Sequence, residues 1–328
     1  MHIDQSLFQP NDSELGTMSK NLLTISPKGF RALLSGASST SRVIPVDATW
    51  YMPNSPHNAR KQFKEERLEN GVFFDLDSVA LPDSKYPHML PTFEHFKNSV
   101  SQLGIKKDDK VVVYDKQGIF SSPRVAWNFS LFGHQNVYLL DNYNTYKKSE
   151  YPLDTKSIDT NNGVENVQYE TISNEKFDSN YKSQVIEYTE LLDLVKSGKL
   201  EEDYVFFDAR STDRFTGESP EPRPGLPSGH VPSSLSLPFT KVLNTDKTFK
   251  SRSELIELFK NDYGIDFESS DFPKKHGIIV SCGTGVTAVI LRVAIESVIG
   301  STVPIRVYDG SWTEWAQRAP SEFIITDV

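Results

Sequence analysis

The stretch "GIIVSCGTGVTAVILRVAIESVIG" (277–300) decides the fold of the second half of the chain. It begins as a β-branched apolar run, passes through an uncharged loop of Gly and Thr, and continues as an apolar segment of helical length. The only cysteine of the chain, Cys282, stands where the expected strand ends. A buried strand that leads directly into a helix predicts a parallel α/β sheet, in which ligands bind at the carboxyl ends of the strands.

The same order of elements occurs earlier in the chain. The stretch "KVVVYDKQGIFSSPRVAWNFSLFG" (110–133) also predicts a strand, a loop of small residues and a helix, with Asp115 in the place of Cys282. Two further pairs of segments match, each a strand ending in Asp: "RVIPVDATWYMP" (42–53) with "DYVFFDARSTDRF" (203–215), and "NVYLLDNYNTYKK" (136–148) with "IRVYDGSWTEWAQ" (305–317). The offsets lie between 161 and 168 residues, which indicates a tandem duplication.

The predicted fold class is therefore α/β, with two tandem domains that each contain a mainly parallel sheet flanked by helices. We expect residues 1–20 to be an N-terminal extension and 21–150 to form the first domain. Residues 151–183 are polar and rich in Asn, Ser, Thr and Asp, which predicts a linker. Residues 184–328 then form the second domain.

Composition excludes several classes of function. The formal net charge is −9 and the pI is near 5.4, which argues against a dedicated nucleic-acid surface. A single cysteine cannot form an internal disulfide, which fits a reducing compartment. The seven histidines show no metal-binding spacing, and no apolar stretch reaches membrane-spanning length. We expect a soluble globular protein without metal, cofactor, membrane contact or direct nucleic-acid contact.

The cysteine loop predicts reactivity. Its two glycines allow a tight curl that turns backbone N–H groups inward, and the following helix adds partial positive charge. Both favour an anion on the sulfur of Cys282, ready to act as a nucleophile. A buried, inert cysteine is the alternative interpretation. A cysteine phosphatase is disfavoured, because its loop needs an arginine at the position of Ala288, and the first arginine here is Arg292.

Four segments of the second half resemble the catalytic domain of the two-domain rhodanese family of sulfurtransferases: "CGTGVT" (282–287), "FDARSTDRFTGESPEPR" (207–223), "SGHVPSSLSLPF" (228–239) and "YDGSWTEW" (308–315). Three segments of the first half resemble the inactive domain of that family: "VDATWYMP" (46–53), "FFDLDSVALPDSKYPHMLP" (73–91) and "YDKQGIFSSPRVAW" (114–127). The resemblance covers roughly residues 21–320.

The resemblance implies a sulfurtransferase that carries sulfur as a persulfide on Cys282. Neutral residues after the cysteine, here Gly283 and Thr284, are the pattern of mercaptopyruvate sulfurtransferases, whereas enzymes that prefer thiosulfate usually carry basic residues there. The implied reaction takes sulfur from mercaptopyruvate, releases pyruvate and passes the sulfur to a thiol acceptor. The alternatives are a thiosulfate sulfurtransferase and a non-enzymatic persulfide carrier loaded by a cysteine desulfurase.

The resemblance also implies roles for individual residues. The implied catalytic residues are Cys282, Thr284, His88 and Asp77, and the last three form a proton relay. The implied substrate-binding residues are Arg214 and Arg223. The implied persulfide-stabilising loop consists of Gly283, Thr284, Gly285, Val286 and Thr287. Family members usually have Ser at the Thr284 position, and Thr keeps the hydroxyl while restricting its rotamer. From the residues alone, the arginines could belong to a solvated charged loop and His88 could be structural.

The closest resemblance is to fungal-type members that supply sulfur for thiolation of tRNA wobble uridines. It implies acceptors such as thioredoxin-like or rhodanese-type sulfur-relay proteins, and a cysteine desulfurase as a further partner. The expected location is the cytoplasm, with a mitochondrial fraction as a second expectation.

Overall fold

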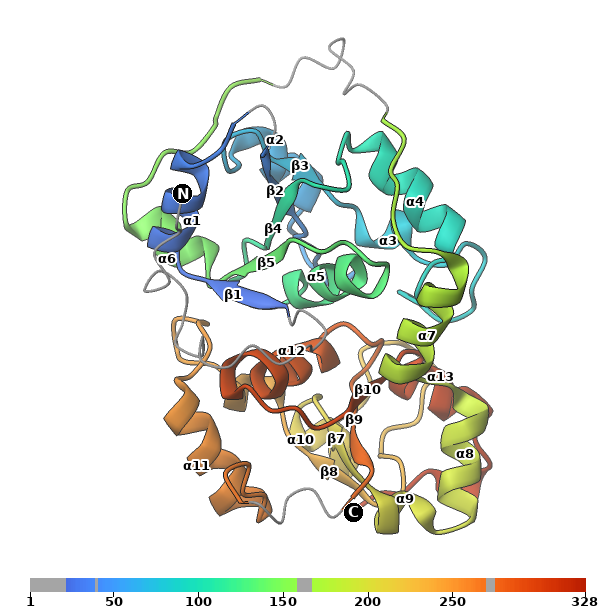
Figure 1. Ribbon diagram of the computed structural model, residues 1–328. Coiled ribbons are helices and arrows are strands. Elements are labelled where there is room, and N and C mark those ends of the chain that lie inside the picture. The colour runs from blue at the N-terminus through green and yellow to red at the C-terminus, as the bar shows by residue number, and fades with distance from the viewer. Residues whose placement is uncertain (1–21, 39–40, 158–166, 270–274) are drawn as a thin grey trace. The chain divides into compact units, whose positions relative to one another are not determined.

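A computed structural model describes residues 22–38, 41–157, 167–269 and 275–328 (Figure 1). The chain forms two compact units. Within the described residues, unit 1 consists of 22–82, 91–177 and 245–248, and unit 2 of 83–90, 178–244 and 249–328. Residues 83–90, from the first half of the chain, thus belong to unit 2, and residues 245–248, from the second half, belong to unit 1. The predicted extension, residues 1–20, lies outside the described residues.

Unit 1 is built on a five-stranded sheet with the order β1-β5-β4-β2-β3, and all its strand pairs are parallel. Its strands are β1 (Leu23–Ile25), β2 (Val43–Asp47), β3 (Val72–Phe73), β4 (Lys110–Tyr114) and β5 (Val137–Leu140). Its helices are α1 (Pro27–Ser35), α2 (Ala59–Glu65), α3 (Leu76–Val79), α4 (Phe93–Gln102), α5 (Ser122–Leu131) and α6 (Tyr143–Lys148). Helix α7 (Asn174–Gln184) carries the chain from unit 1 into unit 2.

Unit 2 repeats this design with the order β6-β10-β9-β7-β8, again with parallel pairs only. Its strands are β6 (Val185–Ile186), β7 (Tyr204–Asp208), β8 (Ser234–Ser236), β9 (Gly277–Ser281) and β10 (Ile305–Tyr308). Its helices are α8 (Tyr188–Lys196), α9 (Lys199–Asp203), α10 (Thr212–Thr216), the 3₁₀ helix η2 (Phe239–Val242), α11 (Arg252–Tyr263), α12 (Ala288–Val293), the π-helix η3 (Ala294–Ile299), α13 (Ser311–Arg318) and the 3₁₀ helix η4 (Ser321–Phe323).

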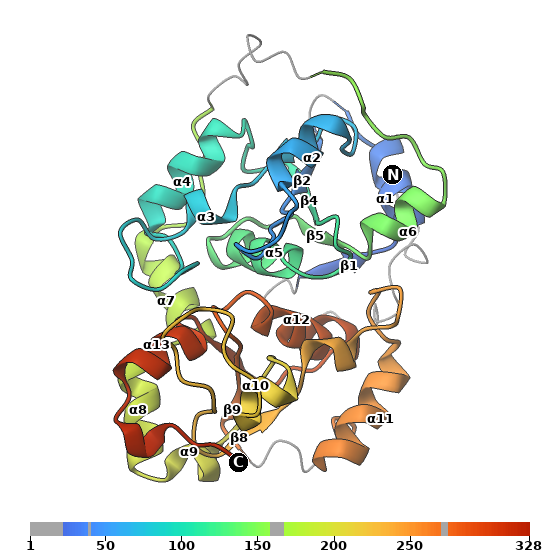
Figure 2. The ribbon, with the colours of Figure 1, turned by 180° about the vertical axis from the view of Figure 1, so that it is seen from behind.

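The two sheets therefore share one strand order, and helices flank each of them (Figure 2). The predicted fold class is confirmed. The strands are apolar along their length because both faces of a parallel sheet are covered. In unit 2, for example, β9 is buried throughout, and Trp312 and Trp315 of α13 pack into the same core as Phe206 and Ile279.

The segment predicted as a linker is partly built into the fold. Tyr169 is only 1% exposed, its hydroxyl lies 2.8 Å from His134 Nδ1, and its ring stacks on that of His134. Composition favoured a surface connection, but Tyr169 and the ion pair of Asp154 with Arg67 fasten the segment to the rest of unit 1. Helix α7 follows it.

The described residues contain neither a helix long and apolar enough to cross a bilayer nor a group of three metal-binding side chains.

The loop between β4 and α5 encloses a carboxylate. Asp115 is fully buried, and its two oxygens accept four backbone N–H hydrogen bonds at 2.9–3.0 Å and a hydroxyl bond at 2.6 Å. The backbone donors belong to Gln117, Phe120, Ser121 and Ser122, and the hydroxyl to Ser122. Gly118 permits the curl with a φ of 109°. Burial raises the pKa of Asp115 above its usual value, although these bonds oppose the shift.

We expect Asp115→Asn to lower the free energy of unfolding by about 3 kcal/mol, because at least one buried N–H group would then face an amide NH₂ group. Urea denaturation followed by circular dichroism measures the loss. Asp108→Asn, at an exposed position shortly before β4, is the matched control and should change stability by less than about 0.5 kcal/mol. Equal effects of the two substitutions would contradict the structural role of Asp115.

Candidate active site

Cys282 lies directly after β9, at the start of the loop that leads into α12. The residue is 2% exposed, and both the strand before the loop and the helix after it are buried. Gly285 has a φ of 75°, in the left-handed region also used by Gly118 at the matching place in unit 1. The two loops are thus built alike, and Cys282 occupies the position of Asp115.

The N–H groups of the cysteine loop differ from those of unit 1 in their partners. Counted from the cysteine, Thr284, Thr287 and Ala288 match Gln117, Phe120 and Ser121 of unit 1. The unit 1 groups all donate to Asp115, whereas their three counterparts donate to no acceptor among the described residues. Unit 2 therefore keeps the donors of an anion-binding loop and lacks the built-in anion.

The start of α13 holds the beginning of the cysteine loop. The N–H of Cys282 donates to Ser311 Oγ at 3.1 Å, and its carbonyl accepts from the N–H of Trp312 at 3.0 Å. The Gly283 carbonyl accepts from both the N–H and the hydroxyl of Thr313, at 3.0 and 2.7 Å. Because these bonds fix the backbone on both sides of the sulfur, α13 sets the position of Cys282.

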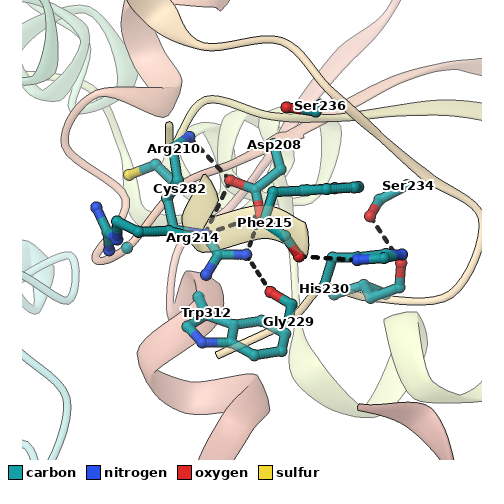
Figure 3. A network of polar contacts seen from close by, with 12 residues as sticks. Asp208, Arg210, Arg214, Phe215, Gly229, His230, Ser234, Ser236, Cys282 and Trp312 are labelled. Carbon is teal, nitrogen blue, oxygen red and sulfur yellow. Dashed lines mark hydrogen bonds and ion pairs between the residues drawn. The ribbon is translucent and has the colours of Figure 1, made fainter. Parts of the chain in front are cut away.

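Arg214, on α10, lies beside the cysteine loop (Figure 3). A Cβ atom added to Gly283 would be 3.2 Å from Arg214 Nη2, so the guanidinium covers the bare backbone of that glycine. Nε and Nη2 donate to the two carboxylate oxygens of Glu221, at 3.1 and 2.6 Å. Nη1 donates to no described residue, and 24% of the Arg214 side chain is exposed. The structure thus places this expected substrate-binding residue beside the loop of Cys282.

The guanidinium of Arg210 is surrounded by two carboxylates, a carbonyl oxygen and an aromatic ring. Its guanidinium pairs with Asp208 at 2.7 Å and Glu221 at 2.8 Å, donates to the carbonyl of Gly229, and lies 4.4 Å from the centre of the Trp312 ring. Figure 3 shows Arg210 with Asp208, Gly229 and Trp312, and Asp208 is the last residue of β7. Burial disfavours the charged form, but the ion pairs outweigh it and raise the pKa of Arg210. These contacts make Arg210 an anchor of the site.

His88 lies against the cysteine loop. Its Nδ1 is 2.9 Å from Thr284 Oγ1, and both residues are less than 10% exposed. His88 belongs to the 83–90 segment of unit 2, which is fastened to the end of β10 by a 2.7 Å bond from Leu90 N–H to Asp309 Oδ2. Two members of the expected relay are therefore in hydrogen-bonding distance.

Two further residues, Asp77 and Arg223, were expected in the site. Asp77 belongs to unit 1, at the start of α3, where its carboxylate accepts from the indole N–H of Trp50 at 3.0 and 3.1 Å. Arg223 is half-buried in the irregular segment between α10 and β8. The roles of Asp77 and Arg223 stay predictions. His230 stacks on Phe215 with ring centres 3.9 Å apart, which places it in the packing of the loop.

Glu221 is the residue that sequence reasoning missed. Its side chain is 3% exposed and bridges Arg210 and Arg214. Its only signal in the sequence is its place in "GESPEPR", among charged residues that also suit an exposed loop.

Known proteins resemble this chain along nearly its full length. A Rhodanese-like domain matches residues 187–318. Thiosulfate sulfurtransferase TUM1 of Saccharomyces cerevisiae is 41% identical over 302 residues, which are 92% of this chain and 96% of that protein. Thiosulfate/3-mercaptopyruvate sulfurtransferase 1, mitochondrial, of Arabidopsis thaliana is 37% identical over 83% of this chain and 71% of its own. The crystal structure of the Saccharomyces cerevisiae Tum1 protein matches with a TM-score of 0.82 and 39% identity, over 93% and 98% of the two chains.

We expect Arg210→Gln to lower the free energy of unfolding by about 3–5 kcal/mol, because Asp208 and Glu221 would lose the cation that compensates their buried charges. Urea denaturation of the variant measures this loss. Lys241→Gln is the control, since Lys241 forms an exposed pair with Asp262 whose removal should cost much less. A loss for Arg210→Gln no greater than that of the control would show that Arg210 is not an anchor.

Proposed function

This chain belongs to the rhodanese family and is a sulfurtransferase, and from that premise we propose that it moves sulfur from 3-mercaptopyruvate to a thiol acceptor through a persulfide on Cys282. The observation that carries the proposal is the cysteine loop. It presents backbone N–H groups that have no acceptor among the described residues, in a loop whose counterpart in unit 1 encloses an anion. Donors arranged in this way favour negative charge on the sulfur of Cys282.

In the proposed first half-reaction, the Cys282 thiolate attacks the sulfur atom of mercaptopyruvate. An S–S bond forms, the C–S bond breaks, and its electron pair goes to the pyruvate enolate. The proton of the substrate thiol ends on the enolate carbon, so that pyruvate leaves and an anionic persulfide remains on Cys282. An acceptor thiolate then takes the outer sulfur and restores the Cys282 thiolate. Neither half-reaction needs an added oxidant or a metal.

The loop N–H groups are proposed to stabilise the persulfide as those of unit 1 stabilise the Asp115 carboxylate. The loop consists of Gly283, Thr284, Gly285, Val286 and Thr287. Because the donors are backbone groups fixed by β9 and α12, they need no rearrangement when the second sulfur arrives.

Arg214 is proposed to bind the substrate carboxylate or polarise its ketone, with Arg223 as a second cation. The support for Arg214 is its place over Gly283 and its Nη1, which donates to no described residue. Support for Arg223 comes from the family pattern alone.

Thr284, His88 and Asp77 are proposed to move the proton. The 2.9 Å distance between His88 Nδ1 and Thr284 Oγ1 allows His88 to exchange a proton with the hydroxyl, which delivers it to the enolate. Asp77 is proposed to orient His88, as carboxylates do in other relays.

Mercaptopyruvate is proposed as the donor because Gly283 and Thr284 place no cationic side chain after the nucleophile. Thiosulfate is the second candidate, favoured by the name of the TUM1 relative. The Arabidopsis relative is named for both donors.

We propose onward transfer to thioredoxin-like or rhodanese-type relay proteins, with tRNA wobble-uridine thiolation as the destination and a cysteine desulfurase as a further source of sulfur. The net charge of −9 supports protein partners in place of direct contact with tRNA. We propose a cytoplasmic location with a mitochondrial fraction, the latter supported by the mitochondrial Arabidopsis relative.

Cys282→Ser should abolish pyruvate release from mercaptopyruvate, because a hydroxyl cannot form the persulfide. Coupled detection of pyruvate measures the rate, and mass spectrometry of the wild-type chain should find one added sulfur on the peptide that contains Cys282. Circular dichroism of the variant controls for folding. Full pyruvate release by the folded variant would refute the mechanism.

The donor is tested by comparing kcat/KM for mercaptopyruvate and thiosulfate under the same conditions with one thiol acceptor. We expect mercaptopyruvate to be favoured by about tenfold or more, equivalent to a difference of about 1.4 kcal/mol in activation free energy. A ratio near one, or a preference for thiosulfate, would instead support the second candidate.

A further inference from the structure

The Glu221 carboxylate is shared by two arginines with different tasks. Oε1 accepts from Arg210 Nη1 at 2.8 Å and from Arg214 Nε at 3.1 Å, while Oε2 accepts from Arg214 Nη2 at 2.6 Å. The side chain of Arg210 is 1% exposed and that of Glu221 is 3% exposed, whereas that of Arg214 is 24% exposed. One buried carboxylate thus joins a buried cation to a half-exposed one.

The buried side of this bridge is rigid. The other nitrogens of Arg210 bind Asp208 and the Gly229 carbonyl, and its guanidinium plane covers the Trp312 ring. Glu221 is therefore anchored before it meets Arg214. Since its two oxygens meet two guanidinium nitrogens side by side, the pair fixes the plane of the Arg214 guanidinium as well as its distance.

The exposed side of the bridge reaches the reacting centre. Helix α10 is only five residues long, and a long side chain on it loses about 2 kcal/mol of rotamer entropy when it is held in one place. The bond to Glu221 selects the orientation in which Arg214 Nη2 lies over Gly283, next to Cys282. It also leaves Nη1 as the edge that can meet a substrate carboxylate.

We propose that Glu221 is a positioning residue for sulfur transfer, which aims Arg214 at the substrate through the Arg210 anchor. The inference rests on the proposed role of Arg214 in binding mercaptopyruvate. Glu221 has a second effect: it adds a negative charge beside an anion-binding arginine, so it weakens the general attraction for anions while it improves orientation. Its removal should therefore lower kcat more than it raises KM.

A double-mutant cycle tests the proposal with the full chain. Glu221→Gln, Arg214→Gln and the double variant are compared in kcat and KM for mercaptopyruvate. We expect Glu221→Gln to lower kcat/KM by about 10- to 100-fold in the wild-type background, which is the scale of a small misplacement of a catalytic group. In the Arg214→Gln background it should change kcat/KM by less than about twofold, because the group that it positions is gone.

The matched control is Glu218→Gln, an exposed carboxylate three residues earlier, which should leave kcat/KM unchanged. Glu221→Asp keeps the charge and shortens the side chain by one methylene. If the Gln variant is poorly folded, the Asp variant replaces it in the cycle, with a smaller loss that again disappears in the Arg214→Gln background.

Each outcome separates the two hypotheses. If Arg214→Gln leaves kcat/KM unchanged, the proposed role of Arg214 is wrong and the Glu221 proposal fails with it. If Arg214→Gln lowers kcat/KM but Glu221→Gln does not, only the Glu221 proposal is overturned. Losses that add in the double variant would show that Glu221 acts through general stability, which also overturns it.

Discussion

The turn from a central strand into a helix leaves several backbone N–H groups without helical partners, and the rest of this structure depends on how they are satisfied. In unit 1 they converge on the Asp115 carboxylate. In unit 2, three of the four matching groups, those of Thr284, Thr287 and Ala288, have no acceptor among the described residues. The fourth, that of Val289, donates to the carbonyl of Val286. The same backbone requirement thus produces a finished structural element in one unit and, under the proposed function, an anion-binding loop in the other.

This difference is the basis for proposing that one unit of a duplicated chain is reactive and the other silent. The two sheets have the same strand order, and both loops use a glycine with positive φ. Unit 1 has no cysteine, and the carboxylate that replaces the sulfur is fully buried and fully hydrogen-bonded. An anion that is covalently part of the loop cannot leave, so the unit 1 loop has no room for a second one.

Much of the fold could be predicted from the sequence, because the alternation of apolar strands with helix-length segments is a local signal. The reactive loop was also visible, since Gly283 and Gly285 flank Thr284 between a strand and a helix. The hydrogen bonds and ion pairs that hold this loop in place could not be predicted from the sequence. The bonds that join Cys282 to Ser311 and Gly283 to Thr313, and the bridge made by Glu221, connect residues that only the folded chain brings together. His88 and Thr284 are 196 positions apart, so only the family resemblance could pair them.

In the group of charged side chains beside Cys282, the direction of the arginine N–H donors matters more for the proposed substrate binding than the total charge. Asp208, Arg210, Glu221 and Arg214 form one connected group of ion pairs, and their formal charges sum to zero. Such a group has little long-range attraction for anions, which agrees with a chain of net charge −9. At short range, however, each N–H of Arg214 is fixed in direction. Under the proposed role of Arg214, a ligand would be recognised by whether its oxygen atoms fit that edge, and a small planar carboxylate fits it better than a diffuse or larger anion. The proposed preference for mercaptopyruvate thus follows from a rigid, neutral cluster that presents one arginine edge beside a bare glycine.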